Sequence, residues 1–329
     1  MSLDVTESKV SFKPRGGGRT RMVPAGRGLT APPVGQPIER PVTPVVRGRI
    51  NTTNDKGTRS TSDFSLGYVT KAMDKATKEK PPRKGEDRRR KEDNQPKDYK
   101  QKVVMKPWGY EFLIFENESV AIWYLRIDKG HSTSMHCHPL KKTCLINLSG
   151  EALCNTLERR NYLKTIEAVV IENSVFHSTK ALSENGSELL EIETPPNKID
   201  LVRLNDSYGR EMKSYEGSME MQIKNLNRFN YFHFNEPNEK ATPTHSYNGY
   251  SITMEAYANN EEFQEKFNLE KNELFCLCRG QISTKGKNEV LLNVGDAYNS
   301  QTKFVASEEN LKISSPVLIL KAKQQLPKN

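Results

Sequence analysis

The stretch Gly130-His131-Ser132-Thr133-Ser134-Met135-His136-Cys137-His138, followed later by Gly150 and His177, determines the fold expected for this chain. Histidines at positions i and i+2 of a strand project from the same face, so His136 and His138 can bind one ion together. A third imidazole on a neighbouring strand, His177, completes a three-point cage for a divalent metal. The alternative is three polar rings hydrogen-bonded inside a β-barrel, which costs more free energy. We predict one divalent ion, Zn, Fe, Mn or Ni, at these three histidines.

The basic residues of the chain are concentrated in residues 1–100, which hold 23 Lys and Arg against 12 Asp and Glu. This segment also contains ten of the 18 prolines and ten of the 20 glycines, and its apolar residues follow no sustained period. It cannot bury enough surface to offset the entropy of ordering, so we predict a disordered tail and linker, in which residues 62–80 alone show a helical pattern that could serve as a docking helix. The Arg- and Gly-rich run at 13–28 is either a solubilising extension or a contact for nucleic acid or another acidic partner.

From Lys102 onward, short apolar runs alternate with turn signals, a pattern typical of an all-β sandwich or barrel. Strands are expected at 110–115, 120–127, 143–148, 151–156, 168–171, 174–179 and 189–194. A second block follows from about residue 229, with strands expected at 250–257, 274–278, 290–292 and 317–322 and a helical turn at 260–267.

The five cysteines are odd in number, and all lie after residue 100. The first thirty residues are polar and show no signal-peptide pattern, and no apolar run reaches the length of a membrane span. We therefore expect a cytoplasmic protein with free thiols and no membrane partner. Cys137 lies between His136 and His138, so it faces the other side of the strand and is expected to pack as a small hydrophobe.

The histidine motif resembles that of the cupin superfamily, G-x5-H-x-H-x4-(E)-x6-G with a later strand histidine. Gly130, His136, His138, Gly150 and His177 fall at its positions. The flanking stretches 106–111 and 200–210 look like the edges of the cupin domain in type II mannose-6-phosphate isomerases and related sugar cupins of surface-polysaccharide pathways. The resemblance covers about residues 103–212. It implies a double-stranded β-helix, or jelly roll, that holds a divalent ion and acts on a phosphosugar or nucleotide sugar.

Two departures from the family pattern concern the ion and the chemistry. Thr143 occupies the place where a cupin carries its glutamate ligand, so the site is either a three-histidine cage or binds metal more weakly. Isomerisation of a sugar also needs a proton acceptor near the ion. Glu172 and His131 are the catalytic candidates by sequence proximity. Alternatively, Glu172 is a turn residue that faces solvent, and His131 is a residue at the rim of the site.

Basic residues around the motif are candidates for binding a phosphate group. Lys141, Lys142 and Arg126 can attract a phosphate or pyrophosphate, although charged residues at strand ends are usually only solvated. Arg203 and Arg210 belong to the closing motif of the family, and the sequence leaves open whether they contact a ligand or pair with nearby aspartates.

The second block resembles a degenerate copy of the first. Residues 273–280 repeat the E-x6-G ending of the first motif and residues 294–297 resemble the turn that opens the second, but no histidine pair precedes Glu273. We expect a metal-binding cupin domain at 101–212 and a second, degenerate cupin-like domain without an ion at 213–329. In such a bicupin the second barrel either packs against the first or forms homodimer contacts.

Three functions follow from these patterns. The leading hypothesis is a metal-binding cupin that isomerises or epimerises a phosphosugar or nucleotide sugar in carbohydrate or polysaccharide biosynthesis. The second is a sugar-binding or regulatory cupin module without turnover. The third is a nucleic-acid-associated assembly protein that uses the basic tail and keeps the barrel as a scaffold.

Overall fold

The computed structural model describes residues 46–47, 98–210, 221–222, 225–238, 242–285, 290–299 and 311–325. Most of the predicted tail, including the helix expected at 62–80, lies outside these residues. In the described residues the chain consists of strands with little helix, so the predicted all-β class is confirmed. No helix in these ranges is long and apolar enough to cross a lipid bilayer.

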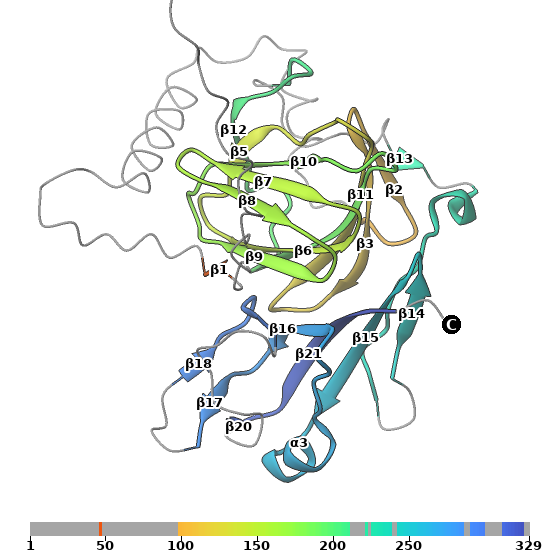
Figure 1. Cartoon of the computed structure of the whole chain (residues 1–329). Helices are drawn as coiled ribbons and strands as arrows, with labels where there is room; N and C mark the ends of the chain where they lie inside the picture. The colour runs from red at the N-terminus through yellow and green to blue at the C-terminus, as the bar shows by residue number, and fades with distance from the viewer. Residues whose placement is uncertain are drawn as a thin grey trace, which may run out of the picture. The chain divides into compact units, whose positions relative to one another are not determined.

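The first barrel is built from two sheets that face each other (Figure 1). The larger sheet has, in spatial order, β1 (Val46–Arg47), β9 (Glu167–Ile171), β6 (Lys142–Ser149), β11 (Ser187–Thr194), β4 (Ala121–Ile127), β3 (Gly109–Glu116), β2 (Val103–Lys106) and β13 (Met221–Gln222). The smaller sheet has β12 (Val202–Asn205), β5 (Met135–Cys137), β10 (His177–Ala181), β7 (Ala152–Thr156) and β8 (Arg160–Leu163). All pairings within the barrel are antiparallel except that of β1 with β9.

The larger sheet is buried on both faces, which explains the apolar runs of β3 and β4. In β4, Trp123 and Leu125 point into the first barrel, whereas Ile122 and Tyr124 belong to a core shared with the second barrel. Because successive side chains of a strand alternate between faces, a sheet covered on both sides takes apolar residues at most positions. Strands with one solvated face show the alternating pattern instead, as β8 does.

The second barrel is smaller, and its interior is filled by side chains. One sheet contains β14 (Thr244–Tyr247), β15 (Tyr250–Tyr257), β21 (Val317–Gln324), β16 (Glu273–Arg279) and β19 (Ala297–Asn299). The other contains β18 (Val290–Leu292), β17 (Ile282–Thr284) and β20 (Leu311–Ile313). Tyr257, Phe275 and Tyr298 of the first of these sheets belong to one buried cluster with Phe263 and with aliphatic residues of both sheets. In the part of this barrel that the structure describes, apolar side chains therefore fill the interior.

The two barrels share a continuous apolar core. The outer face of the first barrel's larger sheet packs on the larger sheet of the second barrel (Figure 1). Ile146 and Leu190 of the first barrel belong to one buried cluster with Met254 and Leu320 of the second. Of the two roles left open for the second barrel, packing against the first is thus observed, and homodimer formation stays a prediction.

Polar contacts complete the junction between the barrels. Lys142 pairs with Asp296 at 3.1 Å, and Asn248 donates to Glu188 at 2.8 Å. The segment that connects the two barrels is hydrogen-bonded to the first one: the backbone N–H of Phe234 donates to the carbonyl oxygen of Ile114 at 2.7 Å.

Most of the expected elements are present, with shifted ends. The helical turn expected at 260–267 is α3 (Asn260–Lys266), whose N-cap Asn259 accepts the backbone N–H of Glu262 at 2.9 Å. A short 3₁₀ helix, η2 (Leu226–Phe229), precedes the second barrel. The strand expected at 174–179 begins only at His177, because Ser174 has a φ of 62° and forms a turn. The five cysteines are free, as expected, and all five are buried.

The turn before Asp296 provides a test of the junction. Gly295 has a φ of 81°, and a Cβ there would lie 2.6 Å from Thr194 Oγ1 of the first barrel, whereas Gly249 has a φ of 79° with its nearest atom at 3.8 Å. We expect Gly249→Ala to cost about 1–2 kcal/mol from the left-handed backbone alone. Gly295→Ala should cost about 1–3 kcal/mol more from overpacking. Urea unfolding of both variants measures this difference, and equal losses would contradict the observed junction.

Candidate metal centre

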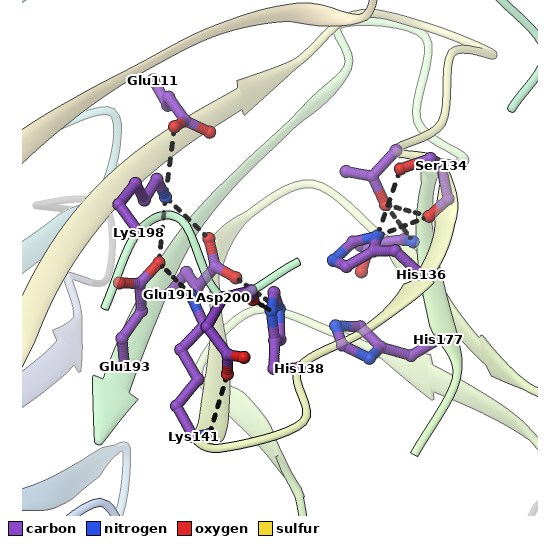
Figure 2. A network of polar contacts seen from close by, with 12 residues as sticks. Glu111, Ser134, His136, His138, Lys141, His177, Glu191, Glu193, Lys198 and Asp200 are labelled. Carbon is purple, nitrogen blue, oxygen red and sulfur yellow. Dashed lines mark hydrogen bonds and ion pairs between the residues drawn. The ribbon is translucent and has the colours of Figure 1, made fainter. Parts of the chain in front are cut away.

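Three histidines meet inside the first barrel because of the register of β5 and β10. His136 on β5 is paired directly with His177 on β10, and His138 follows His136 two residues later on the same face. Directly paired residues of antiparallel strands carry neighbouring side chains. The ring centroids lie 4.5 Å apart for His136 and His177, 4.9 Å for His136 and His138, and 5.3 Å for His138 and His177 (Figure 2). The sequence-predicted triad is therefore brought together.

Each of the three rings is oriented by a hydrogen bond to a backbone carbonyl. Nδ1 of His136 bonds the oxygen of Ser134 at 2.7 Å, Nδ1 of His138 that of Asp200 at 2.6 Å, and Nδ1 of His177 that of Val175 at 3.0 Å. A carbonyl oxygen can only accept, so Nδ1 carries the proton in every ring and Nε2 of the neutral ring keeps its lone pair. One ligand nitrogen from each ring lies within 4.8 Å of the other two.

The surroundings keep the three imidazoles neutral. Burial lowers the pKa of His136 and of His138 well below the ordinary value, with further lowering by His177 and by Lys141 respectively. Burial also lowers the pKa of His177. Nε2 of His138 is buried without a hydrogen-bond partner among the described residues. Neutral rings with converging lone pairs fit a divalent cation bound by three imidazoles.

A network of buried charges lies beside the histidines (Figure 2). The ammonium of Lys198 is 3.0 Å from Glu193, 3.1 Å from Glu111 and 3.6 Å from Glu191, and Lys141 is 2.8 Å from Glu193. Burial alone lowers the pKa of Lys198, but the three carboxylates raise it above its ordinary value. Burial likewise raises the pKa of Glu193, but Lys141 and Lys198 lower it overall. Lys198 and Glu193 therefore stay ionised at neutral pH, because each compensates the other.

A cavity of about 60 Å³ lies between the histidines and the charged network. Its wall contains the three histidines, the five residues of the network and, among others, Arg203 and Arg210. Arg210 also pairs with Asp206 at 2.7 Å, which is one of the two roles that the sequence left open for it. Since one water needs roughly 10–15 Å³ on this measure, the cavity has room for a cation and a few waters.

The candidate phosphate-binding residues lie in different places. Lys141 lines the cavity. Lys142, its neighbour on β6, points the other way and pairs with Asp296 of the second barrel. Arg126 bonds the backbone oxygen of Asn185 and is not part of the cavity wall.

The two catalytic candidates from the sequence are not part of the cavity wall either. Glu172 is half-buried in the turn after β9, where its carbonyl accepts the N–H of Val175. His131 is exposed, and its Nδ1 is 3.1 Å from the hydroxyl of Tyr208. The residue that replaces the usual glutamate, Thr143, is buried next to Glu193 on β11, and its hydroxyl has no hydrogen-bond partner among the described residues.

Cys137, which lies between two of the histidines, packs in an apolar environment. Its side chain is fully buried against Phe176, on the face of β5 opposite His136. Burial raises the pKa of this thiol to about 12, so it stays protonated. It packs as a small hydrophobe, as the strand alternation predicts.

Sequence reasoning missed the acidic residues of the network and Lys198. Glu191 and Glu193 alternate with apolar residues in the run Leu189-Leu190-Glu191-Ile192-Glu193, which places both carboxylates on one face of β11. That alternation was a detectable signal. The pairing of Lys198 with Glu111 joins distant segments and has no local signal.

Comparison with known proteins gives fold neighbours only. No family model and no curated protein matches the chain. Among solved structures it is similar to KdgF from Halomonas sp. (16% identity, 28% of this chain and 84% of that chain, TM-score 0.27). It is also similar to a sugar phosphate isomerase of the cupin superfamily from Silicibacter pomeroyi (8% identity, 29% of this chain and 64% of that chain, TM-score 0.27). A third similar structure is the capsular polysaccharide assembling protein CapF from Staphylococcus aureus (14% identity, 32% of this chain and 34% of that chain, TM-score 0.29).

Each of these likenesses covers about a third of this chain or less. The assignment of the fold therefore rests on the chain's own features: two facing antiparallel sheets with β5 and β10 adjacent, and histidines on their inner face. These define a cupin-type double-stranded β-helix, as the sequence motif predicted.

The buried histidines predict a pH dependence of stability for the metal-free protein. Their pKa values are lowered in the folded state, so below about pH 6.5 the unfolded chain binds protons that the folded chain cannot, and stability falls. Each histidine contributes up to about 1.4 kcal/mol per pH unit. Urea unfolding with a chelator at pH 7.5 and pH 5.5 should show a smaller loss for His136→Gln than for the unchanged protein.

The exposed His131 provides the control for this measurement. His131→Gln should leave the pH dependence unchanged, because it alters none of the three buried rings: His131 is exposed, and its ring bonds Tyr208 among the described residues. Identical pH dependence in the unchanged protein and in both variants would contradict the neutral, buried triad.

Proposed function

We propose that the first barrel is a metal-dependent site that isomerises or epimerises a phosphosugar or nucleotide sugar, with the ion held by His136, His138 and His177. The observation that carries this proposal is the convergence of three imidazoles, each fixed by its Nδ1 hydrogen bond, beside buried carboxylates and ammonium groups. When bound there, a divalent ion polarises a carbonyl or hydroxyl oxygen of the sugar.

Proton transfer is assigned to the charged network. Glu193 is a buried carboxylate in the cavity wall, and its Oε2 has no hydrogen-bond partner among the described residues. Lys141 and Lys198 keep it ionised, so it can accept a proton from a carbon or hydroxyl beside the polarised oxygen. The ammonium groups of both lysines lie 2.8 and 3.0 Å from the Glu193 carboxylate, so they stabilise its negative charge whenever the proton leaves. Glu193 thus takes the role that proximity suggested for Glu172 and His131.

The balance of charge in the wall favours an anionic substrate. Three lysines are balanced by three glutamates, namely Lys106, Lys141 and Lys198 against Glu111, Glu191 and Glu193. Arg203 and Arg210 add two more positive charges to the wall, so five basic side chains stand there against three acidic ones, and Asp206 outside the wall pairs with Arg210. A divalent cation makes the site more positive still, which suits a phosphate or pyrophosphate group.

A metal-supported binding module without turnover is the second candidate. It is favoured by the cavity volume of about 60 Å³, which is small beside the roughly 300–1,000 Å³ of sites that enclose small organic ligands. The nucleic-acid hypothesis concerns the tail, nearly all of which lies outside the described residues, and stays a prediction.

Metal analysis combined with substrate assays tests the proposed function. The purified chain should retain about one divalent ion and convert mannose-6-phosphate, fructose-6-phosphate or a nucleotide sugar. Glu193→Gln should lower kcat roughly 10²–10⁴-fold because it removes the proton acceptor. Glu172→Gln, outside the cavity wall, should leave kcat unchanged. Sugar binding without any turnover supports the module instead, and absence of metal overturns both candidates.

A further inference from the structure

The cavity contains a carboxylate that faces one of the histidines without forming an ion pair. Oε1 of Glu191 lies 3.9 Å from Nε2 of His138. Nδ1 of His138 carries the ring proton, since it bonds the carbonyl oxygen of Asp200 at 2.6 Å. Nε2 therefore presents a lone pair to a negatively charged oxygen. Such a contact is repulsive unless a cation lies between the two atoms.

Both partners of this contact are buried and held in place. His138 is 5% exposed, and its Nε2 has no hydrogen-bond partner among the described residues. Glu191 is 8% exposed and lies in the middle of β11, paired with Leu145 on one side and Trp123 on the other. Its second oxygen, Oε2, is 3.6 Å from the ammonium of Lys198, which leaves Oε1 directed towards His138 (Figure 2).

The separation of the two atoms is short enough for two ligands of one ion, whereas the ligand atoms that all lie within 4.8 Å of one another are those of His136, His138 and His177, so Glu191 reaches the ion by a small rotation of its side chain. Zinc binds histidine nitrogen at about 2.0–2.1 Å and carboxylate oxygen at about 2.0–2.2 Å, so two such ligands can be up to about 4.3 Å apart. The observed 3.9 Å lies within this limit.

The residue at position 143 cannot supply a carboxylate, because it is a threonine. Its neighbour across the β6–β11 pairing is Glu193, and Glu191 lies two residues away on the same inward face of β11. An acidic group thus enters the cavity from the strand beside the one that the cupin motif predicts.

We propose that Glu191 is a carboxylate ligand of the metal centre and replaces the glutamate that is absent at position 143. This inference rests on the proposed metal centre and adds a fourth protein ligand to it. The carboxylate reduces the net charge of a bound divalent ion from two to one. Because carboxylate ligands suit harder ions, the Glu191 carboxylate shifts the preference of the site towards ions such as Mn²⁺.

Matched variants of one strand test the proposal. Glu191→Gln keeps the size of the side chain and removes its charge, while Glu188→Gln makes the same change in a buried glutamate of β11 that contacts Asn248 of the second barrel. Calorimetric titration of the full, metal-depleted chain with Mn²⁺ and with Zn²⁺ measures the affinity of each variant. We expect Glu191→Gln to weaken binding at least tenfold, with the larger loss for Mn²⁺, as loss of a supporting group does in metal sites generally. Glu188→Gln should change affinity less than about twofold, since it lies outside the metal centre.

The outcomes separate this inference from the proposed function. Equal affinity of the unchanged chain and Glu191→Gln overturns the role of Glu191 but leaves the three-histidine centre intact. No binding by the unchanged chain overturns the metal centre itself. If Glu191→Gln does not fold, diffraction from zinc-loaded unchanged protein decides: a Glu191 oxygen within about 2.5 Å of the ion supports the proposal, and one beyond about 3.5 Å overturns it.

Discussion

The candidate site depends on three hydrogen bonds from imidazole Nδ1 atoms to backbone carbonyl oxygens. Without them the rings of His136, His138 and His177 could rotate or change tautomer, and their Nε2 lone pairs would not converge. Two of the accepting carbonyls, those of Ser134 and Val175, lie two residues before the histidine that they bind. The third belongs to Asp200, whose side chain also accepts the N–H groups of Leu140 and Lys141. Local backbone and the closing segment of the barrel thus fix the site together.

The contrast between the two barrels follows from what fills them. In the second barrel, aromatic side chains such as Phe275 and Tyr298 occupy the interior. In the first, polar and charged residues replace such groups on the inner face of β11, and the space between them stays open. Burying these charges is costly, and their mutual pairing offsets only part of that cost. The shared apolar core between the barrels provides the stability that such an interior lacks.

Much of the fold could be predicted from the sequence, because strand alternation and turn residues act locally. The i, i+2 spacing of His136 and His138 was sufficient to place both rings on one face, and the later His177 was correctly expected on a neighbouring strand. The ends of elements were less predictable, as the turn at Ser174 illustrates. The chain direction at the start of β6 also explains why Lys141 and Lys142 do not share a role: the two neighbours point to opposite sides, and only Lys141 lines the cavity. The ion pairs of Lys198 depend on long-range register, which no local pattern encodes.

The most direct measurement of the central claim is nitrogen NMR of the chain labelled with ¹⁵N-histidine, before and after one equivalent of Zn²⁺. Before metal, His136, His138 and His177 should each show a protonated Nδ1 and a bare Nε2. On addition of zinc the Nε2 signals of these three rings should shift together, while those of His131, His233 and His245 stay in place. Protonated Nε2 atoms in the metal-free chain, or zinc-induced shifts confined to the other histidines, would contradict the account.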